Sequence, residues 1–188
     1  MFIIASGYFG IGDKYRKFYI TKMAENHTIK LYHGSNQAVE QPQLLKPTHP
    51  MDFGAGFYTT TNYQQALDFA KKVAIRQKIG KPTITAYEAQ ENILRSKYKI
   101  LEFYSADKAW LDFVTSNRQI FNPEIDAEIV IGAVANDDII EVVRLYENGV
   151  YTVEETLKRL KIKTLYNQYV FRTQGAINEL ITKEVINV

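Results

Sequence analysis

The sequence predicts an α+β fold in one domain. Its 188 residues are enough to bury one hydrophobic core. Segments that alternate apolar and polar residues, as half-buried strands do, occur beside segments with the apolar spacing of helices. The two kinds of segment do not alternate regularly along the chain, which argues against a doubly wound parallel sheet. An apolar content of 46% with 23% charged residues is ordinary for a globular protein.

The expected strands alternate in polarity or are rich in β-branched residues, and several expected helices begin at residues that cap helices well. The strands are 29–33, a segment around Tyr58, 83–87, 98–103, 128–132, 168–172 and 184–188. The helices are expected after Asn62, Asp107, Asp137 and Thr152, and over 174–181. The helix after Asn62 is expected to bury one apolar face, which carries Ala66, Phe69, Ala70, Val73 and Ala74.

The segment Tyr32-His33-Gly34-Ser35 and the later segment Gly54-Ala55-Gly56-Phe57-Tyr58-Thr59-Thr60 carry the most information about function. The stretch from Gly56 to Asn62 resembles the same region of diphtheria-toxin-type ADP-ribosyltransferases. From Ile29 to the C-terminus the chain is similar to a bacterial family of small ADP-ribosyltransferase-like proteins whose targets are undefined. The resemblance implies a split β-sheet core that binds NAD+ in a cleft between two small sheets.

The resemblance also assigns roles to individual residues of the two segments. His33 would bond a ribose hydroxyl of NAD+, with Gly34 and Ser35 beside it, and Gly34 would let the dinucleotide approach the backbone. Gly56 and Phe57 would precede Tyr58 in the NAD+ site, and the ring of Tyr58 would stack on the nicotinamide. Phe69 would cover the other side of that ring. The alternatives are a turn histidine bonded to local backbone and a phenylalanine in the helix core.

Gln168 is the third catalytic candidate, after His33 and Tyr58. The resembled enzymes place a glutamate on a late strand, and the matching strand here reads Asn167-Gln168-Tyr169-Val170-Phe171-Arg172. An amide oxygen can still accept the ribose 2′-hydroxyl, but it adds no charge where positive charge develops on the sugar. This change argues against chain-elongating poly(ADP-ribosyl)ation. The alternative is an ordinary polar residue on an edge strand.

Other polar residues allow two interpretations each. Arg118 could pair with a pyrophosphate, or it could be a solvated helix end. The run Asn136-Asp137-Asp138 could touch substrate, but a helix N-terminus explains it more simply. Lys71, Lys72 and the cations of 76–81 form a basic helix face of the kind that is most often solvated.

Composition excludes several other classes of function. The formal net charge of +2 is too small to indicate a nucleic-acid footprint for the whole chain. The chain has no cysteine and three dispersed histidines, so we expect no metal site. It also lacks the glycine patterns of Rossmann and P-loop sites. The apolar run at 1–5 is too short to span a bilayer, and we expect a cytoplasmic protein without membrane contact.

The expected organisation is an extension over 1–22, which need not be part of the natural domain, followed by a single domain over 23–188. The expected function is mono-ADP-ribosylation of a macromolecular target with NAD+ as co-substrate. Bacterial enzymes of this kind are often toxins of conflict or toxin–antitoxin systems, so the resemblance also implies a neutralising protein partner. An NAD glycohydrolase and a catalytically inactive NAD-binding domain are the alternatives.

Overall fold

A computed structural model describes residues 27–188, except 121–122, 135–136 and 162–166, and its class is α+β, as predicted. The expected extension over 1–22 and Asn136 lie outside these residues. Within them the strands are β1 (Thr28–Ser35), β2 (Phe57–Thr60), β3 (Thr83–Gln90), β4 (Ile100–Glu102), β5 (Ile129–Ala133), β6 (Asn167–Phe171) and β7 (Ile181–Asn187). The helices are α1 (Tyr63–Gln77), α2 (Glu91–Lys97), α3 (Lys108–Gln119), α4 (Asp137–Glu147), α5 (Val153–Lys161) and α6 (Gln174–Ile177).

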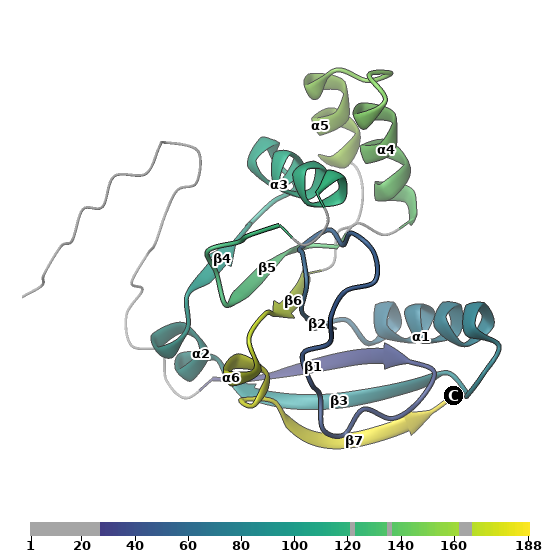
Figure 1. Cartoon of the computed structure of the whole chain (residues 1–188), viewed down its shortest axis with the longest axis vertical. Coiled ribbons are helices and arrows are strands. Elements are labelled where there is room, and N and C mark those ends of the chain that lie inside the picture. The colour runs from purple at the N-terminus through teal and green to yellow at the C-terminus, as the bar shows by residue number, and fades with distance from the viewer. Residues whose placement is uncertain (1–26, 121–122, 135–136, 162–166) are drawn as a thin grey trace, which may run out of the picture.

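The strands form one mixed sheet in the order β4-β5-β6-β2-β1-β3-β7. Its centre is the weakest joint, because β1 and β2 share a single register pair, Tyr32 with Thr60. On one side of this joint β1 pairs with β3 along its full length, and on the other side β2 pairs with β6 from end to end. The sheet therefore consists of a four-stranded block and a three-stranded block joined by this one register pair. Figure 1 shows β1, β3 and β7 of the three-stranded block below β4, β5 and β6 of the other.

The two faces of the four-stranded block enter different hydrophobic clusters. In β6, Val170 belongs to one cluster, whereas Tyr169 and Phe171 belong to the other, as the two-residue period of a strand requires. Val170 packs in the cluster that contains Trp110 of α3 and Leu160 of α5. These helices lie with α4 beyond the four-stranded block (Figure 1).

Helix α1 covers the three-stranded block. The side chain of Asn62 accepts from the backbone N–H of Gln65 at 2.8 Å, which confirms the expected N-cap, and Lys78 ends the helix in the left-handed conformation. The buried residues of α1 are Ala66, Ala70 and Val73. Their small size brings the helix close to β1, where an added Cβ on Gly34 would lie 2.0 Å from the carbonyl oxygen of Ala66.

The expectation that Phe69 shares this buried face is wrong, because its side chain is 52% exposed. Phe69 lies at the edge of the apolar stripe, and the close approach of α1 to β1 leaves a bulky side chain there no room between helix and sheet. The alternative interpretation of Phe69 as helix core is therefore excluded.

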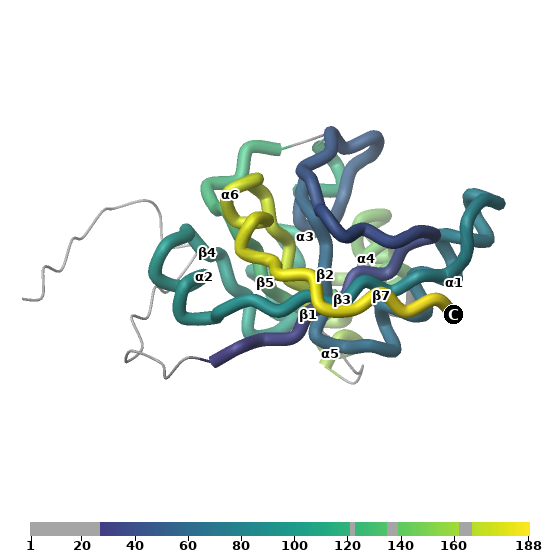
Figure 2. The backbone as a smooth tube through the Cα atoms, turned by 90° about the horizontal axis from the view of Figure 1, so that it is seen from below, coloured from purple at the N-terminus to yellow at the C-terminus, as the bar shows by residue number. Residues whose placement is uncertain are grey.

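The C-terminal elements also differ in their bounds from the expectation. Helix α6 is one turn long instead of extending to 181, and β7 begins at Ile181. Strand β7 forms an edge of the sheet, its register with β3 shifts between Ala86 and Tyr87, and Lys183 lies 3.1 Å from Glu88. Figure 2 shows β7 beside β3 from below. Among the described residues, no helix is both long and apolar enough to span a membrane.

We predict that Gly34→Ala destabilises the fold by about 3 kcal/mol or more, since its methyl group would overlap the backbone of α1. Urea unfolding would measure the loss. Gly175→Ala is the matched control, because an added Cβ there would meet only Tyr98 at an ordinary 3.8 Å. Equal midpoints for the two variants would contradict the close packing of α1 on β1.

Candidate functional site

His33 lies at the joint between the two blocks of the sheet. Its Nδ1 is 2.8 Å from the backbone carbonyl of Tyr58 on β2, and its ring stacks on Phe57 at a centroid distance of 4.5 Å. A carbonyl oxygen only accepts, so Nδ1 carries the proton and Nε2 of the neutral ring is an acceptor. Among the described residues Nε2 makes no hydrogen bond. The alternative, a turn histidine bonded to local backbone, does not fit a bond that crosses from β1 to β2.

Burial favours this neutral form of His33. It lowers the pKa of the imidazole from its ordinary value of 6.5, and the hydrogen bond to the Tyr58 carbonyl only partly opposes that shift. At neutral pH the ring therefore presents an unprotonated Nε2. Such a nitrogen can accept a hydrogen bond from a hydroxyl group of a ligand.

Tyr58 is held rigidly by the loop that precedes β2. Its hydroxyl donates to the carbonyl of Gly54 at 2.7 Å and accepts from the backbone N–H of Phe53 at 3.1 Å. Burial raises the pKa of this hydroxyl far above its usual range, so it stays protonated. The ring packs against the cluster that contains Val170. The hydroxyl of Tyr58 is therefore already bonded, so the side chain can offer a ligand only the exposed part of its ring.

Gln168 is buried, with 7% of its surface exposed. It lies opposite Thr60 on β2 and opposite Gly132 on β5, and Tyr58 is its diagonal neighbour on the same face. Among the described residues its amide makes no hydrogen bond. The amide atoms are not fully enclosed by the described residues, so they can bond to solvent or to a ligand. Gln168 is also on an interior strand, so the alternative of an ordinary edge residue does not hold.

The structure thus places His33, Tyr58 and Gln168 on the adjacent central strands β1, β2 and β6. Their side chains do not all share one face. Tyr58 and Gln168 point to the face of Val170, whereas His33 stacks on Phe57, which packs with Leu31 in the opposite cluster. His33 is linked to Tyr58 by the hydrogen bond from its Nδ1 to the Tyr58 backbone carbonyl. Gln168 lies one strand further, on β6.

The glycines of the two segments have packing roles of their own. Gly34 makes room for α1, and an added Cβ on Gly56 would lie 2.5 Å from Cγ1 of Val170. Arg172 fixes the loop before β2, because its guanidinium donates to the carbonyls of Ala55, Ile125 and Ala127. The Ser35 hydroxyl donates to the side-chain oxygen of its neighbour Asn36 at 3.3 Å.

The structure adds two features that sequence reasoning missed. Tyr32 of β1 meets Tyr63 of α1 edge to face at 5.5 Å, and Tyr32 stands opposite Thr60. The Thr60 hydroxyl lies 2.9 Å from Oε1 of Gln65 and 2.9 Å from the Asn167 carbonyl. These contacts tie the first turn of α1 to the strand of Gln168. The only local signal for them was the dense clustering of tyrosine, threonine and glutamine around the Asn62 cap.

Arg118 forms two ion pairs within the fold. Its Nη1 is 3.1 Å from Asp52 and its Nε is 3.3 Å from Glu147, so α3, the 41–56 segment and α4 meet at this guanidinium. Its side chain is only 23% exposed, so it is not a solvated helix end. Burial raises the pKa of the Asp52 carboxyl, and the positive charge of Arg118 opposes that shift. A pyrophosphate would have to compete with two carboxylates for this group.

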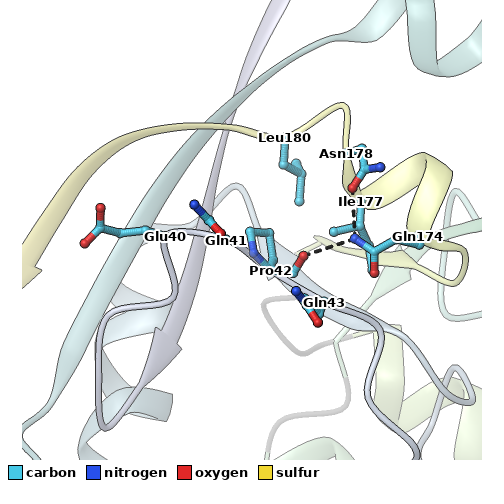
Figure 3. Close-up of a pocket in the computed structure, with 8 residues that line it drawn as sticks. All are labelled: Glu40, Gln41, Pro42, Gln43, Gln174, Ile177, Asn178 and Leu180. Carbon is cyan, nitrogen blue, oxygen red and sulfur yellow. Dashed lines mark hydrogen bonds between the residues drawn. The ribbon is translucent and has the colours of Figure 1, made fainter.

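Two hollows open on the surface, and neither is lined by His33, Tyr58 or Gln168. One is lined by Pro50, Arg118, Gln119 and Glu147. The other, drawn in Figure 3, lies between the 40–43 segment and 174–180. There Gln174 donates to the carbonyl of Pro42 at 3.2 Å and to Asn178 at 2.8 Å. It also accepts from the Leu44 backbone N–H at 2.9 Å, so its amide ties the segment to α6. Among the described residues no group of three metal-binding side chains occurs.

Comparison with known proteins gives a family but no function. Residues 29–181 match the model of a family described as a protein of unknown function (DUF3990). Because this match covers most of the chain, the protein belongs to that family. Neither the curated proteins nor the solved structures include a match.

We predict that Arg118→Ala lowers the free energy of unfolding by about 2–3 kcal/mol, because it leaves two partly buried carboxylates without their cation. Asp52→Asn in the same chain should recover part of the loss. Lys183→Ala, which breaks the more exposed pair with Glu88, should cost less than about 0.5 kcal/mol. Chemical denaturation of the three variants is the measurement, and an unchanged midpoint for Arg118→Ala would contradict a structural role.

We also predict that His33 makes the fold sensitive to acid. The pKa of His33 is lower in the folded chain than the ordinary 6.5, so its contribution to stability is complete above pH 6.5 and decreases as the pH falls through the folded value. Unfolding free energies measured at several pH values should show this decrease, and His33→Gln should reduce it. An identical pH dependence in the variant would assign the effect to other groups.

Proposed function

We propose that the protein is an NAD+-dependent mono-ADP-ribosyltransferase whose site uses residues of the adjacent strands β1, β2 and β6. The observation that carries the proposal is Gln168, a largely buried residue on an interior strand whose amide has no partner among the described residues and is not fully enclosed by them. Such an amide can donate to and accept from a ligand that binds over the strand. The resemblance of the His33, Tyr58 and Gln168 segments to ADP-ribosyltransferases names the ligand.

Gln168 would orient the ribose that carries nicotinamide. Its amide oxygen can accept a hydrogen bond from the 2′-hydroxyl, and the close-packed neighbours Thr60 and Gly132 limit how far it can turn. In the reaction, the bond from the ribose C1 to nicotinamide breaks with its electron pair on nicotinamide. An acceptor nucleophile binds C1 from the opposite side and loses its proton to solvent. A fixed dipole that faces the positive charge on the sugar lowers this barrier.

His33 would hold the second ribose, through the free Nε2 of its neutral ring. The bond from Nδ1 to the Tyr58 carbonyl sets both the tautomer and the direction of Nε2. Ser35 and the backbone of Gly34 lie beside it on β1. The same hydrogen bond couples the position of His33 to that of the Tyr58 segment.

Tyr58 would contribute a preorganised aromatic surface for nicotinamide. Two hydrogen bonds fix its hydroxyl, so little side-chain entropy remains to be lost when a ring stacks on it. Phe69 is exposed on α1 and is free to pack on a ligand from the helix side. Arg118 is the weakest of the proposed contacts, because Asp52 and Glu147 already hold it.

The amide of Gln168 also supports a second candidate, a catalytically inactive NAD+-binding domain. A carboxylate would offset developing positive charge, and a neutral amide offers only a dipole. A glycohydrolase, in which water is the acceptor, would use the same site. The three candidates share NAD+ binding and differ in the fate of the ribosyl group.

We predict that Gln168→Ala abolishes transfer and leaves NAD+ affinity within about three-fold, as expected for a contact that strengthens in the transition state. Gln168→Glu should increase nicotinamide release if the backbone geometry is kept. Asn167→Ala, on the exposed neighbouring position, is the control and should match the wild type. The measurements are calorimetric NAD+ affinity, nicotinamide release, and transfer of label from NAD+ to a cell lysate.

The results separate the candidates. Release without transfer would indicate the glycohydrolase. Binding without release in the wild type, with release gained by Gln168→Glu, would indicate the binding domain. No NAD+ binding by the folded wild-type chain would overturn the proposal for all three.

A further inference from the structure

Exposed cations are concentrated on α1 and the turn after it. The α1 cationic surface consists of Lys71, Arg76, Lys78 and Lys81, all exposed. Among the described residues none of the four side chains makes an ion pair or a hydrogen bond. Elsewhere many cations do have partners, as Arg95, Lys99 and Arg118 show. Lys158 and Lys161 of α5 also make no ion pair among the described residues, but that helix carries Glu154 and Glu155 in its first turn.

The charge balance of the whole chain conceals this concentration. Residues 63–81 contain five cations and one acid, whereas the chain contains 23 cations and 21 acids. This stretch therefore has a charge of +4 and the rest of the chain has a charge of −2. A small net charge argues against nucleic-acid binding only when the charge is spread evenly.

The α1 cationic surface begins near the site. The first turn of α1 is tied to β2 and β6 through Gln65 and Thr60, next to Gln168. Eleven residues separate Gln65 from Arg76, about 16 Å along a helix. A strand of a few nucleotides bound along α1 could therefore place one base near the site.

We propose that α1 is the docking surface for a single-stranded nucleic acid, and that this strand is the acceptor. The role as acceptor rests on the proposed transferase function, whereas the docking does not. The phosphates would contact the α1 cationic surface, and the flexible strand would deliver a base nitrogen to C1 of the ribose. That nitrogen would form the new bond with its lone pair, nicotinamide would leave with the electrons of the broken bond, and a proton would pass to solvent.

The exposed apolar residues of this surface favour a nucleic acid over an acidic protein. Ile75 and Ile79 are 76% and 67% exposed, and they stand among the cations. A stable protein interface buries about 800 Å² per partner around a connected apolar core. Two isolated isoleucines do not provide one, but they can cover the sugars or bases of a strand whose phosphates lie on the cations.

The test is fluorescence anisotropy with labelled 20-nucleotide oligo(rU) and oligo(dT), without NAD+, at several salt concentrations. Three or four phosphate contacts predict that log K falls with log salt with a slope of about −2 to −3. The double variant Arg76→Gln/Lys78→Gln should bind roughly ten-fold more weakly at low salt, and the magnitude of its salt slope should be smaller by about 1.4. Lys158→Gln with Lys161→Gln, on the basic helix α5, is the matched control and should bind as the wild type does.

No binding at low salt, or equal weakening in the control variant, would overturn the docking surface. Equal displacement of the oligonucleotide by poly-L-glutamate of matched charge would also overturn it, in favour of an acidic protein. Calorimetry of the Arg76→Gln and Lys78→Gln variant with NAD+ keeps the two proposals separate, because its NAD+ affinity should be unchanged. If the strand binds and NAD+ does not, the transferase proposal fails together with the acceptor role, and the docking surface stands. If both bind and label from NAD+ reaches only protein, the acceptor role fails.

Discussion

The two blocks of the sheet meet at one register pair, Tyr32 with Thr60, and at one hydrogen bond from His33 to the Tyr58 carbonyl. Every other ladder in the sheet has three or more pairs. Because β1 and β2 share no other register pair, the joint lacks the ladder that joins the other neighbouring strands. Nε2 of His33, at this joint, makes no hydrogen bond among the described residues, and it is here that we propose a ligand binds.

The same joint explains why the elements around it are fixed so firmly. Arg172 clamps the loop before β2, the loop bonds the Tyr58 hydroxyl, and Thr60 ties α1 to β6. These contacts fix the elements on both sides of the short pairing between the blocks. Rigid neighbours of this kind would keep the proposed binding site in position.

Local signals in the sequence predicted the elements well and the long-range contacts poorly. The caps at Asn62 and Asp107 are both present, with bonds to Gln65 and Trp110. Helix α2 was missed because Leu94 is its only buried residue, so it has no repeated apolar spacing. The resemblance located His33, Tyr58 and Gln168, which the fold brings onto adjacent strands. The engagement of Arg118 with Asp52 spans 66 positions in the chain, and no local pattern reports it.

The edge strand β7 affects whether copies of the chain aggregate in concentrated solution. An open strand edge offers unpaired backbone groups to the strands of other molecules, and flat apolar edges aggregate in this way. Here the register shift beside Ala86 bends the ladder, and Lys183 and Glu184 carry charges along the edge. A second copy that approached β7 would have to bury those charges and match a distorted ladder. The edge therefore protects the chain from pairing into sheets shared between molecules.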